Sequence, residues 1–362
     1  MRRPALSALA IAGLASACAR VERPVPSPAL RLAVSEAWNG GSRLVLVDER
    51  GDRWAVLSAG RAAAPSRDEQ AVFSPDGRWV AFVSSRGRDL ARTSLWVMPA
   101  AVGATAVRVT DGTGDDVDPV WTPAGDAVVF ARRVDATFAL ARVTIAGRGD
   151  AVAIGPVERL TTGAGHHVAP SVGPDGDIAY QEIDRDGGRS RIALRAADGS
   201  VTFLTDGPRD ATPAWRPGGA ELAFARAVDR PAGDRDFDLF VLPLDGAPRP
   251  LLDLAGTDES GPRWSADGRW LFATAVIVDV DGALPAVVYV DAAATPAVPR
   301  MLRDQVGAIA RQSPAPMPVA LDAAALAAGP PFVDAVAAAL RERAYARSLT
   351  AVDAGAPDAA GL

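Results

Sequence analysis

Four acidic residues and one histidine recur at nearly constant spacing along the sequence and could act together. Four of these five residues lie three positions before a proline, and the fifth occupies the matching place in its own segment. This charged column consists of Asp68, Asp116, His167, Asp210 and Glu259, with Asp118 close by. In a radial repeat one column of the sequence becomes one ring, so we expect these side chains to surround the axis at one face. Clustered carboxylates raise one another's pKa and concentrate a negative potential.

Three kinds of role fit the charged column. Each side chain could accept hydrogen bonds from backbone N–H groups of its own loop, as aspartate does in turns. The ring could instead dock a cationic or polar segment of a partner. It could also hold a divalent cation, because oxygen ligands suit Ca²⁺ and Mg²⁺. Zinc is the weaker metal hypothesis, since the adjacent His166 and His167 point in different directions on a strand.

The sequence lacks the residue patterns of common catalytic sites. No serine stands in a Gly-x-Ser-x-Gly elbow, and neither a phosphate loop nor a His-Glu-x-x-His pair occurs. We therefore expect a protein that is not an enzyme and has no cofactor. The alternative is an enzyme, or a ligand or metal sensor, that uses the charged column in a central channel. The net charge of −6 disfavours nucleic-acid binding, which requires a basic face.

The elements that must position the charged column form a repeat. The clearest copy runs from Phe73 through Ser-Pro-Asp-Gly to Trp79 and continues as a strand. The phase of the copies is marked by Phe73, Trp121, Val172, Trp215 and Trp264. Their spacings of 48, 51, 43 and 49 residues match a unit of four antiparallel strands, which needs about 40–50 residues. Asp-Gly or Gly-Gly supplies the tight turn, because glycine accepts a positive φ.

These copies predict an all-β fold, a six-bladed β-propeller with four-stranded antiparallel blades over residues 30–315. Five copies carry their own inner strand. The first blade begins near residue 31 without one, and we expect a C-terminal strand near 308–314 to complete it. That segment fits the phase of the repeat, because Gln312 lies 48 residues after Trp264.

The repeat resembles that of the TolB family of propellers. The resemblance is most specific from Ser74 to Met98, where Ser-Pro-Asp-Gly-Arg-Trp is followed by Leu-Trp-Val-Met. An Arg-Leu-Thr before a glycine, at residues 159–161, adds to it. The resemblance covers roughly residues 30–315. It implies a bacterial envelope protein that binds another protein at a propeller face.

The first residues carry the pattern of an export signal. Arg2 and Arg3 precede a short apolar stretch, and small residues then lead to Cys18, the one cysteine of the sequence. This order resembles a bacterial lipoprotein signal peptide over residues 1–18, in which Cys18 receives the lipid that anchors the protein to the membrane. Plain secretion and a retained anchor helix are the alternatives. The Pro-rich residues 19–29 are typical of an extended tether.

The C-terminal residues 316–362 form a Pro- and Ala-rich tail. An apolar stripe predicts a helix at about 332–349, either packed on the propeller or free to bind a partner. The function predicted from these features is that of a non-enzymatic envelope lipoprotein at the periplasmic face of the outer membrane. Its partner would be an envelope protein or peptide that docks on the charged column. A structural role within a larger envelope assembly is a further alternative.

Overall fold

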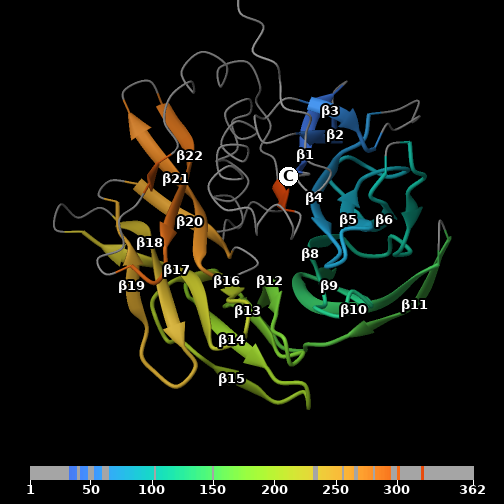
Figure 1. The fold of residues 1–362 in the computed structure, drawn as a ribbon. Helices are drawn as coiled ribbons and strands as arrows, with labels where there is room; N and C mark the ends of the chain where they lie inside the picture. The colour runs from blue at the N-terminus through green and yellow to red at the C-terminus, as the bar shows by residue number, and fades with distance from the viewer. Residues whose placement is uncertain are drawn as a thin grey trace, which may run out of the picture.

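The structure is a computed structural model, shown as a ribbon in Figure 1. It describes residues 32–38, 41–47, 53–58, 65–101, 103–148, 151–230, 235–254, 257–264, 268–279, 282–294, 300–301 and 319–321. These residues contain strands and turns and no helix. None of their elements is a helix that could cross a membrane.

Within the described residues the strands form six antiparallel sheets of four strands each. The first sheet contains β1 (Leu32–Trp38), β2 (Gly41–Val47), β3 (Arg53–Val56) and β24 (Val319–Leu321). The second contains β4 (Asp68–Phe73), β5 (Trp79–Ser84), β6 (Ser94–Pro99) and β7 (Val107–Arg108). The third contains β8 (Asp116–Trp121), β9 (Ala127–Val134), β10 (Thr137–Arg148) and β11 (Ala151–Arg159).

The remaining three sheets repeat this order along the chain. The fourth contains β12 (His166–Val172), β13 (Ile178–Ile183), β14 (Ser190–Arg195) and β15 (Val201–Phe203). The fifth contains β16 (Asp210–Trp215), β17 (Glu221–Asp229), β18 (Arg235–Pro243) and β19 (Arg249–Leu252). The sixth contains β20 (Thr257–Trp264), β21 (Trp270–Asp279), β22 (Gly282–Asp291) and β23 (Arg300–Met301). Figure 1 shows the first strand of each sheet near the centre and the later strands further out, so the predicted all-β blade architecture is confirmed.

A C-terminal strand lies beside β1, but its position differs from the prediction. β24 pairs antiparallel with β1, with Leu321 opposite Leu32 and Val319 opposite Val34. The prediction of this strand near 308–314 was wrong, because the pairing segment lies further along the chain. The phase of the repeat led to the wrong segment, because it aligned the Ser-Pro at Ser313 with the Ser-Pro of the other copies. It ignored the alternation of apolar residues in Val319–Leu321, which suits a strand at the inner edge of the sheet. Residues 308–314 themselves lie outside the described residues.

The Ser-Pro-Asp-Gly segment of the repeat builds the turn between the first two strands of a blade. In the second sheet the Ser74 hydroxyl donates to Asp76 (2.6 Å) and accepts from the N–H of Trp79 (3.0 Å). Burial opposes ionisation of Asp76, but the hydrogen bonds from Ser74 and Arg78 prevail and lower its pKa to about 2. Gly77 has a φ of 67°, which the turn requires. The motif therefore fixes local geometry.

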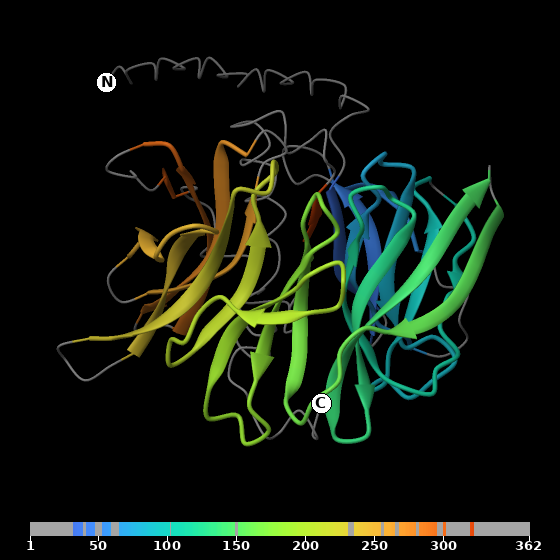
Figure 2. The same ribbon diagram turned by 90° about the horizontal axis from the view of Figure 1, so that it is seen from below.

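The aromatic column binds neighbouring sheets together. Trp121 of the third sheet donates its indole N–H to the carbonyl of Val72 in the second sheet (3.1 Å), and Trp264 does the same to Ala214 (3.1 Å). Both rings are buried in clusters shared by two adjacent sheets. Figure 2 shows the sheets side by side with their strands running through the depth of the ring. The core thus consists of the layers between sheets, where aromatic rings fill the space.

Several predictions fall on parts of the chain outside the described residues. These are the signal peptide 1–18 with Cys18, the tether 19–29 and the helix at about 332–349. They remain predictions.

Candidate functional site

The charged column lies at the beginning of the five inner strands β4, β8, β12, β16 and β20. All five side chains are buried, with exposed fractions between 0 and 4%. The expectation that they form an open ring at a channel mouth is therefore wrong for the described structure. Each group points into its own sheet or the junction with the preceding sheet, where it finds polar partners. The physical reason is that a buried charge without a partner would be costly, so each of these groups is held among polar partners within the fold.

Two of the buried aspartates form ion pairs with the arginine that faces them on the second strand. Asp116 is opposite Arg132 in the register and accepts from its Nε at 2.7 Å. Asp210 is opposite Arg226 and accepts from Nε at 2.6 Å and Nη2 at 2.8 Å. Hydrogen bonding to Asp210 outweighs burial and raises the pKa of Arg226. These bidentate contacts neutralise both carboxylates within the fold.

Asp68 is satisfied in a related way in the second sheet. Its register partner Ser84 donates a hydroxyl hydrogen bond (2.6 Å), and Arg86, two residues further on, supplies the cation at 2.5 Å. The guanidinium therefore comes from the loop instead of the strand, while the carboxylate keeps an arginine partner.

In the fourth sheet the two residue types exchange places. His167 stands in the acidic position, and its register partner is Glu182, whose Oε2 lies 3.7 Å from the histidine Nε2. The other ring nitrogen, Nδ1, lies 2.8 Å from the Thr161 hydroxyl. Burial is the main cause that lowers the pKa of His167, although Glu182 opposes it. The adjacent His166 packs near Phe138 instead, with 6.1 Å between ring centroids, so the two histidines do point apart.

The sixth sheet provides no arginine at the corresponding register position. Glu259 faces Ala275, and its carboxyl group contacts the Thr257 hydroxyl and the Leu254 N–H (3.4 Å). Burial raises the pKa of Glu259 to about 8, and the nearby Asp238 and Asp236 add to the shift. The raised pKa favours the protonated form of Glu259 at neutral pH.

A second group of acids lies beside Glu259 and shares one arginine. Arg230 contacts Asp236 (2.5 Å), Asp238 (2.5 Å) and Asp253 (3.1 Å). Burial, followed by the charge of Asp253, raises the pKa of Asp238 to about 6, while Arg230 opposes the shift. Asp236 and Asp238 on β18 are therefore occupied by one arginine. Within the described ranges, no group of three or more His, Cys, Asp or Glu side chains is arranged to hold a metal ion.

Hydroxyl groups at the ends of the outermost strands connect the column to the preceding sheet. In four sheets such a hydroxyl accepts a hydrogen bond of 2.7–2.9 Å from an N–H of the third strand; the residues are Ser58, Thr110, Thr161 and Thr205. Thr110 also donates to Asp116 of the next sheet (2.5 Å). A single hydroxyl therefore joins two strands of one sheet to the buried acid of the next.

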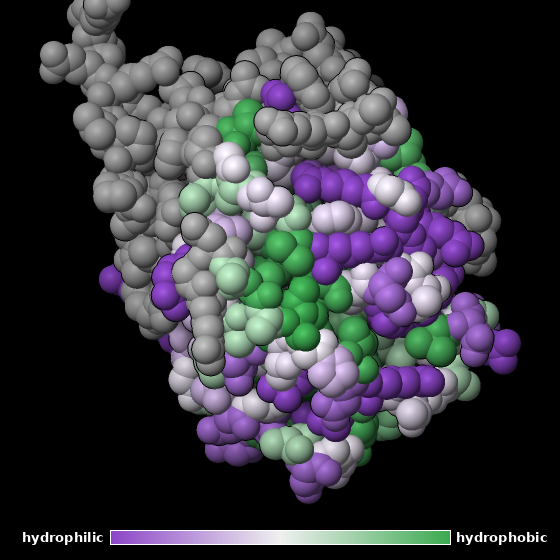
Figure 3. Space-filling view, turned by 90° about the vertical axis from the view of Figure 1, so that its right-hand side faces the viewer, coloured by the Kyte–Doolittle hydropathy of each residue, from purple (hydrophilic) through white to green (hydrophobic). Residues whose placement is uncertain are grey.

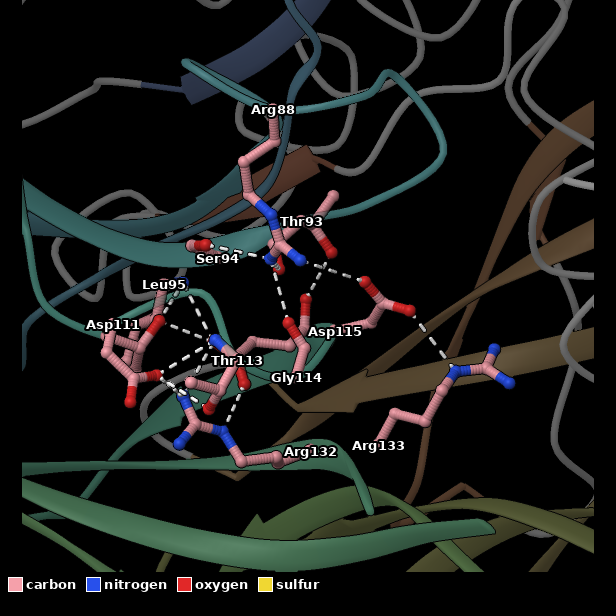
Figure 4. A network of polar contacts seen from close by, with 12 residues as sticks. Arg88, Thr93, Ser94, Leu95, Asp111, Thr113, Gly114, Asp115, Arg132 and Arg133 are labelled. Carbon is pink, nitrogen blue, oxygen red and sulfur yellow. Dashed lines mark hydrogen bonds and ion pairs between the residues drawn. The ribbon is translucent and has the colours of Figure 1, made fainter. Parts of the chain in front are cut away.

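Figure 4 shows polar contacts at the junction between the second and third sheets, with Arg88, Asp115 and Arg132 labelled. Arg88, from the loop between β5 and β6, donates to the carbonyls of Thr93 and Gly114, both at 2.8 Å. Its other nitrogen lies 3.7 Å from Asp115, which also pairs with Arg133 at 3.2 Å. These hydrogen bonds and ion pairs thus join the second sheet to the third.

The residue two positions after each member of the charged column belongs to a second ring, which the sequence pattern did not reveal. Each inner strand is bulged there, because the register with the second strand shifts. Five bulge residues have a positive φ of 49–61°, namely Gln70, Asp118, Ala169, Thr212 and Gly261. Four of them are not glycine, and such a backbone costs of order 1–3 kcal/mol each. No shared residue type marks the ring in the sequence, since its members are glutamine, aspartate, alanine, threonine and glycine.

Hydrogen bonds link this bulge ring from one inner strand to the next. The Gln70 amide donates to the Asp118 carboxylate (3.0 Å) and accepts from the Asp118 N–H (2.8 Å). Asp118 in turn accepts from the N–H of Ala169 (3.1 Å), and Thr212 accepts from the N–H of Gly261 (3.3 Å). Burial raises the pKa of Asp118, while the charge of Arg263 opposes the shift. Asp118, predicted as a neighbour of the charged column, belongs to this ring instead.

Comparisons with known proteins agree with this architecture. No family model matches the sequence. The Tol-Pal system protein TolB of Anaeromyxobacter dehalogenans (strain 2CP-1) is 38% identical over 98 residues, which cover 25% of this chain and 22% of the relative. The matched segment therefore spans about a fifth of that curated relative.

Two solved structures show the same fold. TolB of Acinetobacter baumannii superposes with a TM-score of 0.54 and 19% identity, covering 76% of this chain and 64% of that one. The periplasmic gluconolactonase of Pseudomonas aeruginosa superposes with a TM-score of 0.51 and 17% identity, covering 79% of this chain and 84% of that one. The chain is therefore a β-propeller with TolB-like relatives, matched to TolB in sequence over a quarter of its length.

Proposed function

We propose that this protein is a non-enzymatic binding propeller of the bacterial cell envelope, and that a protein or peptide segment docks on the bulge ring. The charged column is a poor docking surface, because its side chains are buried and paired. The bulge ring lies on the same inner strands and retains polar groups that are not fully buried, Gln70 and Asp118 among them. On β8 the proposed docking surface therefore contains Asp118, two residues after Asp116, which the sequence had predicted for this role.

The repeated backbone strain of the bulge ring carries this proposal. Left-handed residues outside glycine persist only where the surrounding structure imposes them, and they cluster at binding and catalytic sites. Thr212 is a pronounced case, because a β-branched side chain is strongly disfavoured at positive φ. A ring that stores strain in four consecutive sheets is organised for more than closure, since aromatic and polar contacts already join neighbouring sheets.

Charge determines the kind of segment that fits this surface. Asp118 offers a carboxylate, and Arg263 on the sixth sheet is exposed and electrostatically coupled to it. A polar segment that carries both donors and acceptors would fit beside these two charged groups, whereas an apolar segment would desolvate them. The Tol-Pal designation of the TolB relatives supports a protein partner in the envelope.

The membrane anchor is the second part of the proposal. We place the lipid on Cys18 and the propeller at the periplasmic face of the outer membrane. Replacing Cys18 by alanine should move the protein from the membrane fraction to the soluble periplasmic fraction and abolish labelling by radioactive palmitate. Unchanged labelling would contradict the lipid anchor without affecting the docking surface.

Site-specific photo-cross-linking tests the docking surface. A photoreactive amino acid at position 263 should form an adduct with one envelope protein in living cells. The same amino acid at Val201, an exposed residue on an outermost strand, should not form it. The variant Asp118→Ala, combined with the label at position 263, should lose the adduct while its circular dichroism stays unchanged. Equal adducts at positions 263 and 201 would refute docking on the bulge ring.

A further inference from the structure

The outermost strand of the third sheet differs from the other outermost strands. β11 has nine residues, whereas β3, β7, β15, β19 and β23 have four, two, three, four and two. Propellers keep their exposed edges short, because a long unpaired edge attracts another strand. In Figure 2 the hairpin of β10 and β11, drawn in green, forms a long outer edge of the ring.

The outer side of β11 is a free strand edge within the described structure. β11 pairs with β10 on one side and is the last strand of its sheet. Its second half carries protecting residues, since Pro156 lacks an N–H and Glu158 and Arg159 are charged. Its first half, Ala151 to Gly155, has neither proline nor charge. Figure 3 views the molecule from the side on which β11 lies in Figure 1, and hydrophobic surface gathers at the middle of that face.

Packing holds this edge in a fixed position. Val152 and Ile154 lie against the core cluster that contains Trp79 and Trp121. Gly147, which is opposite Val152 on β10, touches the Trp79 indole so closely that a Cβ there would be 2.4 Å from the indole nitrogen. Ala151 and Ala153 point to the other face and are exposed. The edge is therefore preformed and requires little ordering to accept a strand.

We propose that the edge Ala151–Gly155 binds the same edge of a second copy of this chain, antiparallel about a two-fold axis through Ala153. In this register Val152 faces Ile154 of the second copy on the packed side of the joined sheet, and Ala153 faces its own copy on the exposed side. The cross-strand pairs are then β-branched and apolar on one face and small on the other. The sequence is self-complementary in this arrangement, which favours a second copy over an unrelated peptide.

Two features limit the assembly to a dimer. A two-fold contact uses the β11 edge of both copies, so this long edge is not left free for growth, and the other outermost strands are short. Pro156 cannot donate a ladder hydrogen bond, so it ends the pairing after Gly155 and fixes the register. This inference does not depend on docking at the bulge ring, which lies on the inner strands.

Charge pairs at Ala153 test the dimer directly. The purified protein should sediment as a dimer in analytical ultracentrifugation. Ala153→Lys alone and Ala153→Asp alone should each be monomeric, because like charges then face each other across the axis. An equimolar mixture of the two variants should restore the dimer. Ala124→Lys, at an exposed turn between β8 and β9, is the matched control and should remain dimeric.

Three outcomes would overturn the proposal. The protein could be monomeric at about 100 µM, well above the micromolar Kd expected of a weak interface. Ala153→Lys could stay dimeric, or the mixture of variants could stay monomeric although both are folded by circular dichroism. Binding of an extended peptide to a monomeric protein at β11 would likewise assign the edge to a different occupant.

Discussion

The junctions before the third and sixth sheets solve the same structural problem in opposite ways. Before the third sheet, the buried Asp116 is paired with Arg132 and bound by the Thr110 hydroxyl. In the sixth sheet, the buried Glu259 faces Ala275 and keeps its proton, with a pKa of about 8. One junction neutralises the acid with a cation and the other with a proton. The comparison teaches that the buried acid at this position of the repeat must be neutralised in both sheets, while the group that neutralises it differs.

The largest effect should follow from removing the cation at the third sheet. Arg132→Met leaves Asp116 buried without a charged partner, which costs about 3–5 kcal/mol of stability. The double variant Asp116→Asn with Arg132→Met should recover a large part of that loss, because no charge remains to be buried. Urea unfolding followed by tryptophan fluorescence measures both. If the single variant lost less than about 1 kcal/mol, the ion pair would not be what neutralises this junction.

A smaller effect, dependent on pH, should appear at the sixth sheet. The pKa of Glu259 in the folded protein lies above its ordinary value of 4.5, so the folded state holds the proton more tightly than the unfolded chain. The stability that this group contributes is complete below about pH 4.5, falls as the pH rises, and is lost above about pH 8. Glu259→Gln keeps the shape without the ionisation, so its free energy of unfolding at pH 8.5 should be higher than that of the unmodified protein.

Unfolding free energies measured from pH 4.5 to 9 check this prediction. The difference between Glu259→Gln and the unmodified protein should grow with pH over that range. The matched control is Asp210→Asn in the fifth sheet, which breaks an ion pair and should destabilise at every pH in the range. A difference that is flat with pH would show that Glu259 is ionised throughout.

The smallest of the three effects should come from the hydroxyl that joins two sheets. Thr110→Val keeps the shape but removes the bond to Asp116 and the acceptor for the Leu95 N–H. The expected loss is about 1–2 kcal/mol in urea unfolding. Thr113→Val removes an exposed hydroxyl from the adjacent turn and should change stability by less than about 0.5 kcal/mol. Equal losses of stability in the two variants would mean that the hydroxyl connection between the sheets does not stabilise the protein.

Local pattern was sufficient to predict the blades. The spacing of Phe73, Trp121 and Trp264 gave the phase of the sheets, and Ser-Pro-Asp-Gly marked the turn after each inner strand. These signals are local because a tight turn and a strand are specified by adjacent residues. The position of the closing strand was not predictable in this way, since β24 meets β1 only through long-range pairing.

The charged column illustrates the limit of sequence reasoning about the site. Its members were found by spacing, and the ring-like recurrence is real. Their burial was not foreseen, because exposure depends on the loops of neighbouring sheets. The partners Arg132 and Arg226 lie sixteen residues after their aspartates, at an offset that only the strand register makes meaningful. The bulge ring was missed because a positive φ at Gln70 or Thr212 follows from strand pairing and leaves no mark in the residue type.

The sequence by itself determined the size, number and internal order of the repeated strands, because those depend on residues close together in the chain. The tertiary structure alone decided which acids are neutralised, by what group, and which side chains remain accessible at the inner strands. The physical reason is that a buried charge is tolerated or refused according to what lies across the strand and between the sheets, and those neighbours are assembled only when the ring forms.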